Sequence, residues 1–261
     1  MSEVPADAEP ALWIRGLGKS FPTKRDAVVD VDLQVWPGEL VAVLGANGSG
    51  KSTMLRCVVS LLQPSAGSVI VAGNDLSSLR GRELRDARQA VGMVFQQGHL
   101  VRRRSALRNA ASGCLGRHHR PATMVGRLPR HELELGWSCL ERVGMTEVAH
   151  RRADTLSGGQ AQRVAIARTL AQQPSVLLAD EPVASLDPEA AAEVMTILRQ
   201  LAVTEGLGVV VVLHQPELAL RHAHRVVGMR AGRAVFDVPV TAADPQAIGA
   251  LYRAGEDTDG G

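Results

Sequence analysis

The segment Gly45–Thr53, with the sequence GANGSGKST, constrains the fold of this chain more than any other part of it. It follows the continuously apolar run Leu40–Leu44, which is typical of a strand covered on both faces. Apolar residues at helical spacing come next, as far as Leu62, and Pro64 ends that predicted helix. The complete fit to G-x-x-x-x-G-K-[ST], between a buried strand and a helix, predicts a phosphate-binding loop.

The chemistry of phosphate binding explains each part of this loop. Glycines let backbone N–H groups converge on phosphate oxygens, and the N-terminus of the following helix adds a partial positive charge. In such loops a lysine, here Lys51, reaches the β- and γ-phosphates, and a hydroxyl, here that of Ser52, binds Mg²⁺. An ordinary glycine-rich turn is the alternative. The predicted nucleotide-binding residues are Gly45, Asn47, Gly48, Ser49, Gly50, Lys51, Ser52 and Thr53.

Strand and helix patterns alternate along most of the chain, which predicts a mostly parallel sheet. Before the phosphate loop, Val29, Val31, Leu33 and Val35 alternate with polar residues, as in a half-buried antiparallel strand. The stretch 98–155 has no strand pattern but shows helical spacing, so we expect a helical insertion there. The other predicted elements are strands at 91–95, 176–179 and 209–213, helices at 160–172 and 188–205, and a hairpin at 225–237.

The composition is that of a folded domain: 261 residues, of which 45% are hydrophobic and 21% charged. The net charge of +2 is too balanced for a protein that coats nucleic acid. Apolar runs of about five residues are far shorter than the ~20 that span a bilayer. Met1–Pro10 lacks the features of a secretory signal, and three widely spaced cysteines favour the reducing cytosol. We expect one domain over 11–250, with a nucleotide-binding core at 11–97 and 156–240, a helical subdomain at 98–155, and flexible tails at 1–10 and 254–261.

Two carboxylates follow the predicted strand 176–179. Because consecutive residues of a strand face opposite ways, Asp180 and Glu181 are expected to have different roles. We expect Asp180 to hold Mg²⁺ and Glu181 to orient and deprotonate an attacking water. A strand that merely ends in acidic residues is the alternative, and the phosphate loop in the same chain argues against it.

The sequence Leu156–Gln160, LSGGQ, precedes the predicted helix 160–172. Its serine and glutamine form a capping box, which any helix can use. The glycine pair goes beyond capping, because two bare backbone N–H groups at a helix N-terminus form a second phosphate site. The nucleotide-binding residues predicted here are Ser157, Gly158, Gly159 and Gln160.

Together, the loop 45–53, the signature 156–160, the acidic strand end 176–181 and the following Ser185–Asp187 resemble the ATP-binding cassettes of ABC transporters along nearly the whole chain. The resemblance implies an α/β P-loop NTPase (ABC ATPase) with a mostly parallel core sheet, an N-terminal antiparallel β subdomain and an inserted α-helical subdomain. It implies ATP hydrolysis with Mg²⁺, in a head-to-tail homodimer where the loop of one subunit and the signature of the other enclose each ATP. It also implies two membrane permease subunits on which the helical subdomain docks, an extracytoplasmic solute-binding protein as an indirect partner, and a peripheral position at the cytoplasmic face of the cell (inner) membrane.

Further site residues follow from the resemblance, position by position. Gln96 is similar to the family's glutamine that contacts metal or water and reports to the helical subdomain, and His214 to the histidine that contacts the γ-phosphate. Phe21 stands where the family has an aromatic that stacks on adenine, with a place in the core as the alternative, and Asp187 is expected to line the dimer interface. The resemblance thus implies Glu181, His214 and Gln96 as catalytic residues, and Ser52, Gln96 and Asp180 as metal ligands.

The prediction of the transported substrate rests only on resemblance to a family. The segments similar to ATP-binding subunits of phosphonate importers are Gly92–Gln97, Leu115–Arg117, His214-Gln215 and Leu251–Arg253. Gly98-His99 and the run Arg102–Arg104 depart from that pattern where the membrane subunit is expected to dock. We expect uptake of phosphonate or a related phosphorus oxyanion, and no nucleic-acid partner. The alternatives are phosphite, phosphate or another solute, an exporter, and a soluble ABC ATPase acting on nucleic acid or ribosomes.

Overall fold

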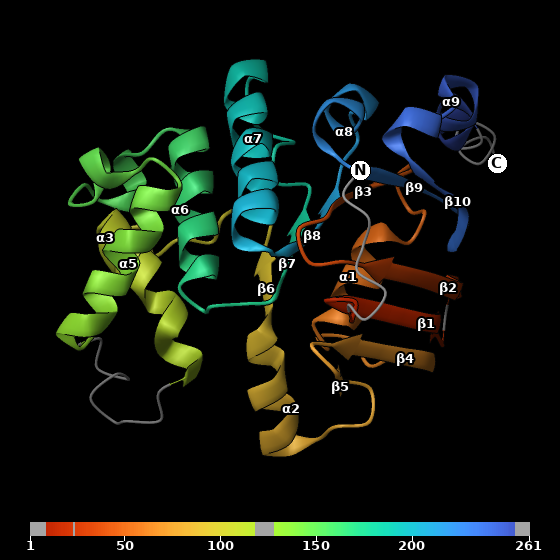
Figure 1. Cartoon of the computed structure of the whole chain (residues 1–261), viewed down its shortest axis with the longest axis horizontal. Helices are drawn as coiled ribbons and strands as arrows, with labels where there is room; N and C mark the ends of the chain where they lie inside the picture. The colour runs from red at the N-terminus through yellow and green to blue at the C-terminus, as the bar shows by residue number, and fades with distance from the viewer. Residues whose placement is uncertain (1–8, 23, 118–127, 254–261) are drawn as a thin grey trace.

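The computed structural model of the chain describes residues 9–22, 24–117 and 128–253. Most of the predicted tails, namely 1–8 and 254–261, lies outside the described residues. Two β-sheets and a group of helices at one end build the described chain (Figure 1). Within the described ranges, no helix is long and apolar enough to cross a bilayer.

The larger sheet has six strands in the order β10-β9-β3-β8-β7-β6. All neighbouring strands pair in parallel except β9 and β10, which form an antiparallel hairpin. The strands lie where the apolar runs predict them, with ends that shift by one residue at β6, β7 and β8. Their bounds are β3 (Leu40–Leu44), β6 (Val91–Val94), β7 (Val176–Asp180), β8 (Gly208–Val212), β9 (Arg225–Arg230) and β10 (Arg233–Pro239).

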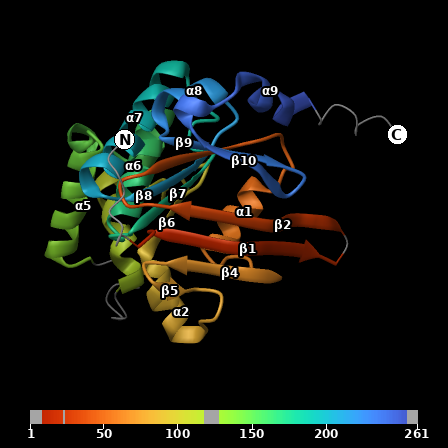
Figure 2. The same ribbon diagram turned by 45° about the vertical axis from the view of Figure 1, so that its right-hand side comes forward.

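A second, antiparallel sheet has the order β2-β1-β4-β5, and its three longer strands lie side by side (Figure 2). Its strands are β1 (Leu12–Phe21), β2 (Lys24–Val35), β4 (Ala66–Val71) and β5 (Asn74–Asp75). The predicted alternation in β2 is wrong at its first member, since Asp30 has a φ of 51° and the pairing with β1 changes register there. Val28 is buried in place of Val29, whereas the three later apolar residues of β2 are buried as predicted.

The helices agree with the sequence pattern best where they are long. Helix α7 has the predicted bounds, because Asp187 caps its N-terminus, Pro188 takes the first helical position and Gly206 ends it in a left-handed conformation. Helix α1 ends at Val58 rather than Leu62, since a residue with a φ of 53° follows at Ser60. The pattern does not predict the short helices α2, α8 and α9. The helices of the described residues are α1 (Lys51–Val58), α2 (Gly81–Ala87), α3 (Ala106–Ala111), α5 (Arg130–Arg142), α6 (Gly158–Leu170), α7 (Pro188–Glu205), α8 (Pro216–His222) and α9 (Pro245–Arg253).

The two faces of the larger sheet belong to two separate hydrophobic cores. In β3, Leu40, Ala42 and Leu44 join a core with α6, α7, α8 and α9, while Val41 and Val43 join a core with α1 and the antiparallel sheet. Every residue of β3 is buried, as a strand covered on both faces requires. The predicted fold class, a mostly parallel core sheet with an N-terminal antiparallel sheet and a helical insertion, is confirmed.

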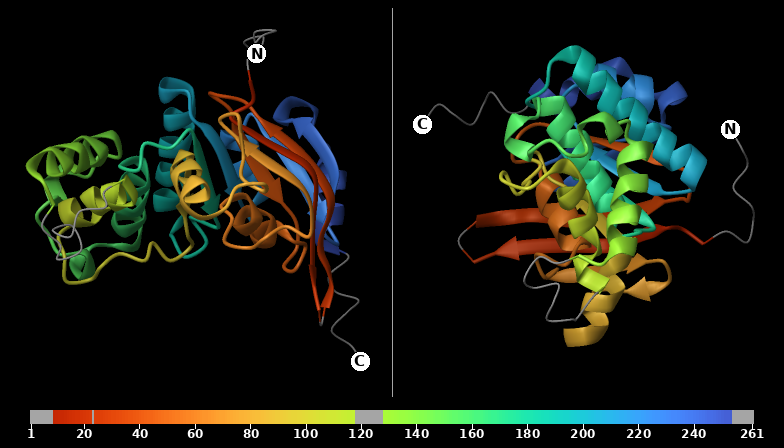
Figure 3. Two further views of the ribbon diagram at one scale, coloured as in Figure 1. Left: turned by 90° about the horizontal axis from the view of Figure 1, so that it is seen from below. Right: turned by 90° about the vertical axis from the view of Figure 1, so that its left-hand side faces the viewer.

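Helices α3 and α5 pack against α6 at the end of the molecule that lies away from the antiparallel sheet (Figure 3). The helical spacing of Leu133, Trp137, Leu140 and Val143 predicts a helix here, and in α5 Leu140 is buried whereas Trp137 is 40% exposed. Helices α3 and α5 approach closely at Gly136. A Cβ atom there would lie 2.7–2.9 Å from the Cβ, backbone N and Cα of Ala111.

We predict that Gly136→Ala destabilises the protein, although alanine normally favours a helix interior over glycine by about 1 kcal/mol. The added methyl group would collide with the backbone of Ala111, so α3 and α5 would have to separate. We expect a loss of about 1–3 kcal/mol in the free energy of unfolding, measured by urea denaturation. Gly116→Ala is the control, because a Cβ there would meet nothing within 4 Å. A Gly136→Ala variant as stable as the parent would contradict this packing.

Candidate functional site

The phosphate loop connects β3 to α1, and its backbone is held between the two sheets. Gly45, with a φ of 152°, lies so close to β9 that a Cβ would overlap the carbonyl oxygen of Met229. Gly50, with a φ of 103°, lies so close to β2 that a Cβ would overlap the carbonyl oxygen of Ala27. Glycine is therefore required at both ends of the loop by close approach as well as by conformation.

Lys51 is the first residue of α1, and its ammonium group lies inside the loop. The side chain is buried, and Nζ donates hydrogen bonds to the carbonyl oxygens of Gly45 at 2.7 Å and Ala46 at 2.9 Å. Burial lowers the pKa of Lys51, while the carboxylates of Glu181 and Asp180 oppose that shift. The structure thus holds a desolvated cation at the place where the sequence predicts phosphate binding.

Ser52 and Asp180 come from different elements and meet at the carboxyl end of the larger sheet. Ser52 Oγ donates to Asp180 Oδ1 at 2.8 Å, which joins the start of α1 to the end of β7. Burial raises the pKa of Asp180, the hydrogen bond from Ser52 opposes it, and the neighbouring Glu181 adds to it. A hydroxyl and a carboxylate side by side are the hard oxygen donors that Mg²⁺ prefers, and a cation there would offset the cost of the buried charge. The residues present therefore fit a magnesium site.

Glu181 and His214 form a second polar pair beside the first. His214 Nε2 lies 2.6 Å from Glu181 Oε1, which links the residue after β7 to the segment after β8. Glu181 has a φ of 50°, a left-handed conformation that costs a non-glycine residue about 1–3 kcal/mol. The prediction that strand alternation points Asp180 and Glu181 in opposite directions is wrong, because β7 ends at Asp180 and Glu181 lies outside the strand. The left-handed turn is what directs Glu181 to a different partner.

Gln96 is exposed just beyond β6, in a segment that accepts hydrogen bonds from side chains of α6. Arg168 of α6 donates to the carbonyl oxygens of Gly98 and His99, both at 2.8 Å, and Gln162 donates to Phe95 at 3.4 Å. Burial lowers the pKa of Arg168. Sequence reasoning missed this arginine, and the helical pattern of 160–172 gives no signal that one of its side chains bonds a distant loop.

The signature residues begin α6 rather than precede it. Gly158 is the first helical residue, and Ser157 and Gln160 form the predicted capping box. The glycines also permit close packing against the start of α7. An added Cβ at Gly159 would lie 3.0 Å from Ala190 Cβ, and one at Gly158 would lie 3.2 Å from Leu186 Cδ2. This packing role is one that the sequence interpretation did not include.

The structure does not bring the signature to the phosphate loop of the same chain. Helices α6 and α1 lie on opposite sides of α7 (Figure 1). Asp187, next to the signature, is exposed and accepts a hydrogen bond from Ala190 N at 2.9 Å as the N-cap of α7. Phe21 is half-buried at the end of β1, paired with Lys24 of the same β1–β2 hairpin whose Ala27 lies against Gly50.

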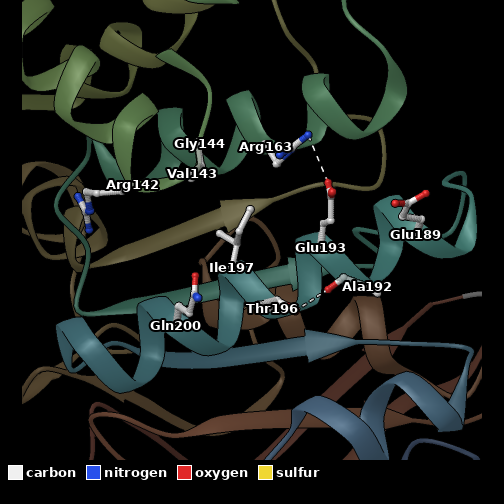
Figure 4. A pocket seen from close by; sticks show the side chains of 10 residues that line it. All are labelled: Arg142, Val143, Gly144, Arg163, Glu189, Ala192, Glu193, Thr196, Ile197 and Gln200. Carbon is white, nitrogen blue, oxygen red and sulfur yellow. Dashed lines mark hydrogen bonds and ion pairs between the residues drawn. The ribbon is translucent and has the colours of Figure 1, made fainter. Parts of the chain in front are cut away.

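A groove of about 510 Å³ lies between α6 and α7, outside this site (Figure 4). The ion pair between Arg163 and Glu193, at 3.3 Å, spans it and ties the signature helix to α7. At the end of the groove Arg142 Nε donates to Glu205 Oε1 at 2.7 Å, which ties α5 to the end of α7. These pairs connect α5 and α6 to α7 across the groove.

Two buried hydroxyl groups have no hydrogen-bond partner among the described residues. One is Ser49 Oγ in the loop itself, and the other is the hydroxyl of Tyr252 at the end of α9. Sequence reasoning placed Ser49 in the loop and gave Tyr252 no role at the site.

We predict that Asp180→Asn raises the stability of the nucleotide-free protein at neutral pH. The folded-state pKa of Asp180 lies above its usual value of 3.8, so folding favours the protonated carboxyl and the ionised form costs stability. The stability that the protonated carboxyl contributes is fully present below pH 3.8, and it is lost as the pH rises through the raised pKa. Asparagine removes the charge and keeps an acceptor for Ser52. We expect a melting temperature higher by about 2–4 °C per kcal/mol gained, measured by calorimetry at pH 7–8, and a smaller difference towards pH 4.

The exposed Asp26→Asn is the control for that measurement, and its melting temperature at pH 7–8 should match the parent's, because the side chain lies in solvent. An Asp180→Asn protein that melts below the parent at neutral pH would show that the ionised carboxylate stabilises the empty site.

Known proteins similar to this chain include ATP-binding proteins of transporters, which agrees with a phosphate-binding site. The family model described as ABC transporter matches residues 28–184. The phosphonates import ATP-binding protein PhnC of Frankia casuarinae is 49% identical over 246 residues, covering 94% of this chain and 97% of the relative. The protein of the same name from Alcaligenes faecalis is 42% identical over 243 residues, covering 93% and 88%.

Solved structures give the same result. The ATP-binding cassette MJ0796, a dimer in a post-hydrolysis state bound to ADP and Pi, is 30% identical with a TM-score of 0.76, covering 88% of this chain and 98% of that one. The cbiO1 protein of Clostridium perfringens, part of the ABC transporter complex cbiONQ, is 26% identical with a TM-score of 0.79, covering 89% and 90%. The predicted resemblance is confirmed, and this chain belongs to the ABC transporter family as one of its ATP-binding cassettes.

Proposed function

We propose that this chain is the ATP-hydrolysing subunit of an ABC importer for phosphonate. The observation that carries the hydrolysis is the arrangement of two polar pairs, Ser52 with Asp180 and Glu181 with His214, beside the buried Lys51. The observation that carries the cargo is sequence similarity, since relatives at 42–49% identity over most of the chain bear the name phosphonates import ATP-binding protein.

The binding residues act on the triphosphate of ATP. Backbone N–H groups of the phosphate loop and the start of α1 bind phosphate oxygens, and Lys51 supplies the positive charge. Ser52 and Asp180 would hold Mg²⁺, with Gln96 as a further ligand from the segment after β6. When bound, Mg²⁺ neutralises charge that develops on the phosphate oxygens.

Glu181 is the catalytic base in this proposal. An attacking water gives its proton to the Glu181 carboxylate while its oxygen bonds to the γ-phosphorus. The bond from that phosphorus to the β–γ bridging oxygen breaks, so ADP and phosphate leave. The short contact to His214 supports the role, because an imidazole with its proton on Nε2 fixes the carboxylate and frees its other oxygen for the water.

The active unit is a homodimer in which each ATP contacts both subunits. The separation of the signature from its own phosphate loop supports this, because the bare amides of Gly158 and Gly159 then meet only the nucleotide of a second subunit. Asp187 lines that interface, and Phe21 stacks on adenine beside the loop.

The remaining partners are two membrane permease subunits, with an extracytoplasmic solute-binding protein engaged through them. The chain would therefore lie at the cytoplasmic face of the cell membrane. A groove of about 330 Å³ supports a permease contact next to the Gln96 segment. Its lining includes the half-exposed Leu61, together with Phe95, Met93 and Arg88. Gln96, which follows the lining residue Phe95 in the chain, is suited to report permease movement to the nucleotide.

We predict that Glu181→Gln binds ATP as the parent does but hydrolyses it at least about 100-fold more slowly. Glutamine keeps the shape of the side chain and the contact with His214 but cannot accept the proton of water. We expect ATP to trap this variant as a dimer, measured by size-exclusion chromatography beside a phosphate-release assay. Glu189→Gln, on the exposed start of α7, is the matched control. Hydrolysis at the parent rate by Glu181→Gln would remove Glu181 from the role of base.

We predict that the chain co-purifies with the permeases encoded beside its gene and drives uptake of a phosphonate into proteoliposomes. Uptake should require ATP and disappear with Lys51→Ala. Competition with phosphite, phosphate and an amino acid, measured as loss of labelled phosphonate uptake, defines the cargo. Uptake of the amino acid with no effect of phosphonate would overturn the proposed substrate and leave the ATPase assignment intact.

A further inference from the structure

Arg168, on the last turn of α6, bonds the segment that follows β6 through both arms of its guanidinium group. One terminal nitrogen donates to the carbonyl oxygen of Gly98 and the other to that of His99, both at 2.8 Å. Charge-assisted bonds from a planar, two-armed group fix direction as well as distance. Because both acceptors are backbone carbonyls of one short segment, this arginine determines where that backbone lies.

The segment that Arg168 bonds turns back on itself and packs on α6. His99 has a φ of 46°, in the left-handed region that residues with a Cβ rarely occupy. Its ring meets the ring of Phe95 edge to face, with 5.5 Å between the centroids. Gly98 is so close to α6 that a Cβ there would lie 3.0 Å from Ala165 Cβ. The turn 95–99 is thus held in an uncommon conformation by contacts with α6.

Gln96 lies inside this turn, between two places where α6 bonds the backbone. Before it, the buried side chain of Gln162 donates to the carbonyl oxygen of Phe95 at 3.4 Å. After it, Arg168 makes the two shorter bonds to residues 98 and 99. Only Gln96 and Gln97, both exposed, lie between these points. The position of the Gln96 backbone therefore follows that of α6.

We propose that Arg168 is a positioning residue for hydrolysis, acting through Gln96. It holds the turn 95–99 on α6, so that the Gln96 side chain is directed to the metal and the attacking water when nucleotide is bound. The same helix begins with the signature glycines, so the turn and the signature move as one body. This inference rests on the proposed role of Gln96 in hydrolysis.

Arg168→Met removes both donors and keeps the apolar stem of the side chain. We expect ATP hydrolysis to fall about tenfold, and the Mg²⁺ concentration for half-maximal rate to rise about tenfold, as when a partner that orients a metal ligand is lost. ATP affinity measured without Mg²⁺ should match the parent's, because Arg168 bonds the turn and not the phosphate loop.

Arg199→Met is the matched control. This arginine of α7 also donates to backbone carbonyls, those of Arg221 and His222, at 3.4 and 3.1 Å. Its loss removes the same kind of bond away from the turn 95–99, so the rate of hydrolysis and the Mg²⁺ requirement should stay at the parent's values.

A double-mutant cycle with Gln96→Ala distinguishes positioning from general damage. Because Arg168 acts through Gln96, Arg168→Met should cause no further loss of rate in a protein that already carries Gln96→Ala. The full tenfold loss in that background would overturn the inference, and so would a parental rate and Mg²⁺ requirement in Arg168→Met alone. If Arg168→Met does not fold, Arg168→Lys, which keeps the charge without the two-armed geometry, takes its place in the cycle.

A spectroscopic measurement reports the turn without nucleotide or activity. The chain has three phenylalanines, Phe21, Phe95 and Phe236, so labelling with 4-fluorophenylalanine gives three fluorine resonances, and Phe95→Leu identifies that of Phe95. We expect Arg168→Met to shift the Phe95 resonance, since the His99 ring leaves it, and to leave the other two in place. An unmoved Phe95 resonance would overturn the inference and leave the proposed function standing. A parent protein that hydrolyses no ATP would overturn the proposed function, and the role of Gln96 with it.

Discussion

The phosphate loop depends on backbone contacts to two sheets at once. Gly45 lies against β9 and Gly50 lies against β2, while the turn between β9 and β10 closes the gap: Gly232 N donates to Ser49 O at 3.0 Å and Gly232 O accepts from Val29 N at 2.8 Å. Loop, turn and strand thus form one hydrogen-bonded unit. The small antiparallel sheet thus helps to fix the shape of the phosphate loop, because its strand β2 packs against one side of that loop.

The sequence predicts best what local patterns determine. The bounds of β3 and α7 follow from an uninterrupted apolar run and from a proline and glycine at the helix ends, and the phosphate loop follows from its glycine spacing. Contacts between distant segments escape such reasoning. The register change at Asp30 depends on β1, and the left-handed conformation of Glu181 depends on the elements around the carboxyl end of β7. The residue pattern predicts neither the register change nor the left-handed conformation.

The signature glycines illustrate how one residue can satisfy two requirements. Their bare amides at the start of α6 suit a phosphate, which is how the sequence alone explains them. The structure adds that a Cβ at Gly159 would lie only 3.0 Å from Ala190 Cβ of α7, so the two helices would have to shift slightly to admit it. A larger residue there would therefore also disturb the packing of α6 on α7. Loss of activity on substitution would therefore not by itself identify a phosphate contact, whereas a change in nucleotide-dependent dimerisation at unchanged stability would.

The polar groups of the site are hydrogen-bonded within the protein, and nucleotide binding has to compete with these bonds. Lys51 bonds its own loop, Ser52 bonds Asp180, and Glu181 bonds His214. Nucleotide binding must replace part of this network, so its affinity is the difference between new and existing hydrogen bonds rather than the sum of the new ones. Burial opposes the charged forms of both Lys51 and Asp180, which offsets part of the stability that these hydrogen bonds give. A bound triphosphate would place negative charge beside Lys51, and a bound cation would place positive charge beside Asp180. These opposite charges would compensate the cost of burying each residue, which favours nucleotide binding.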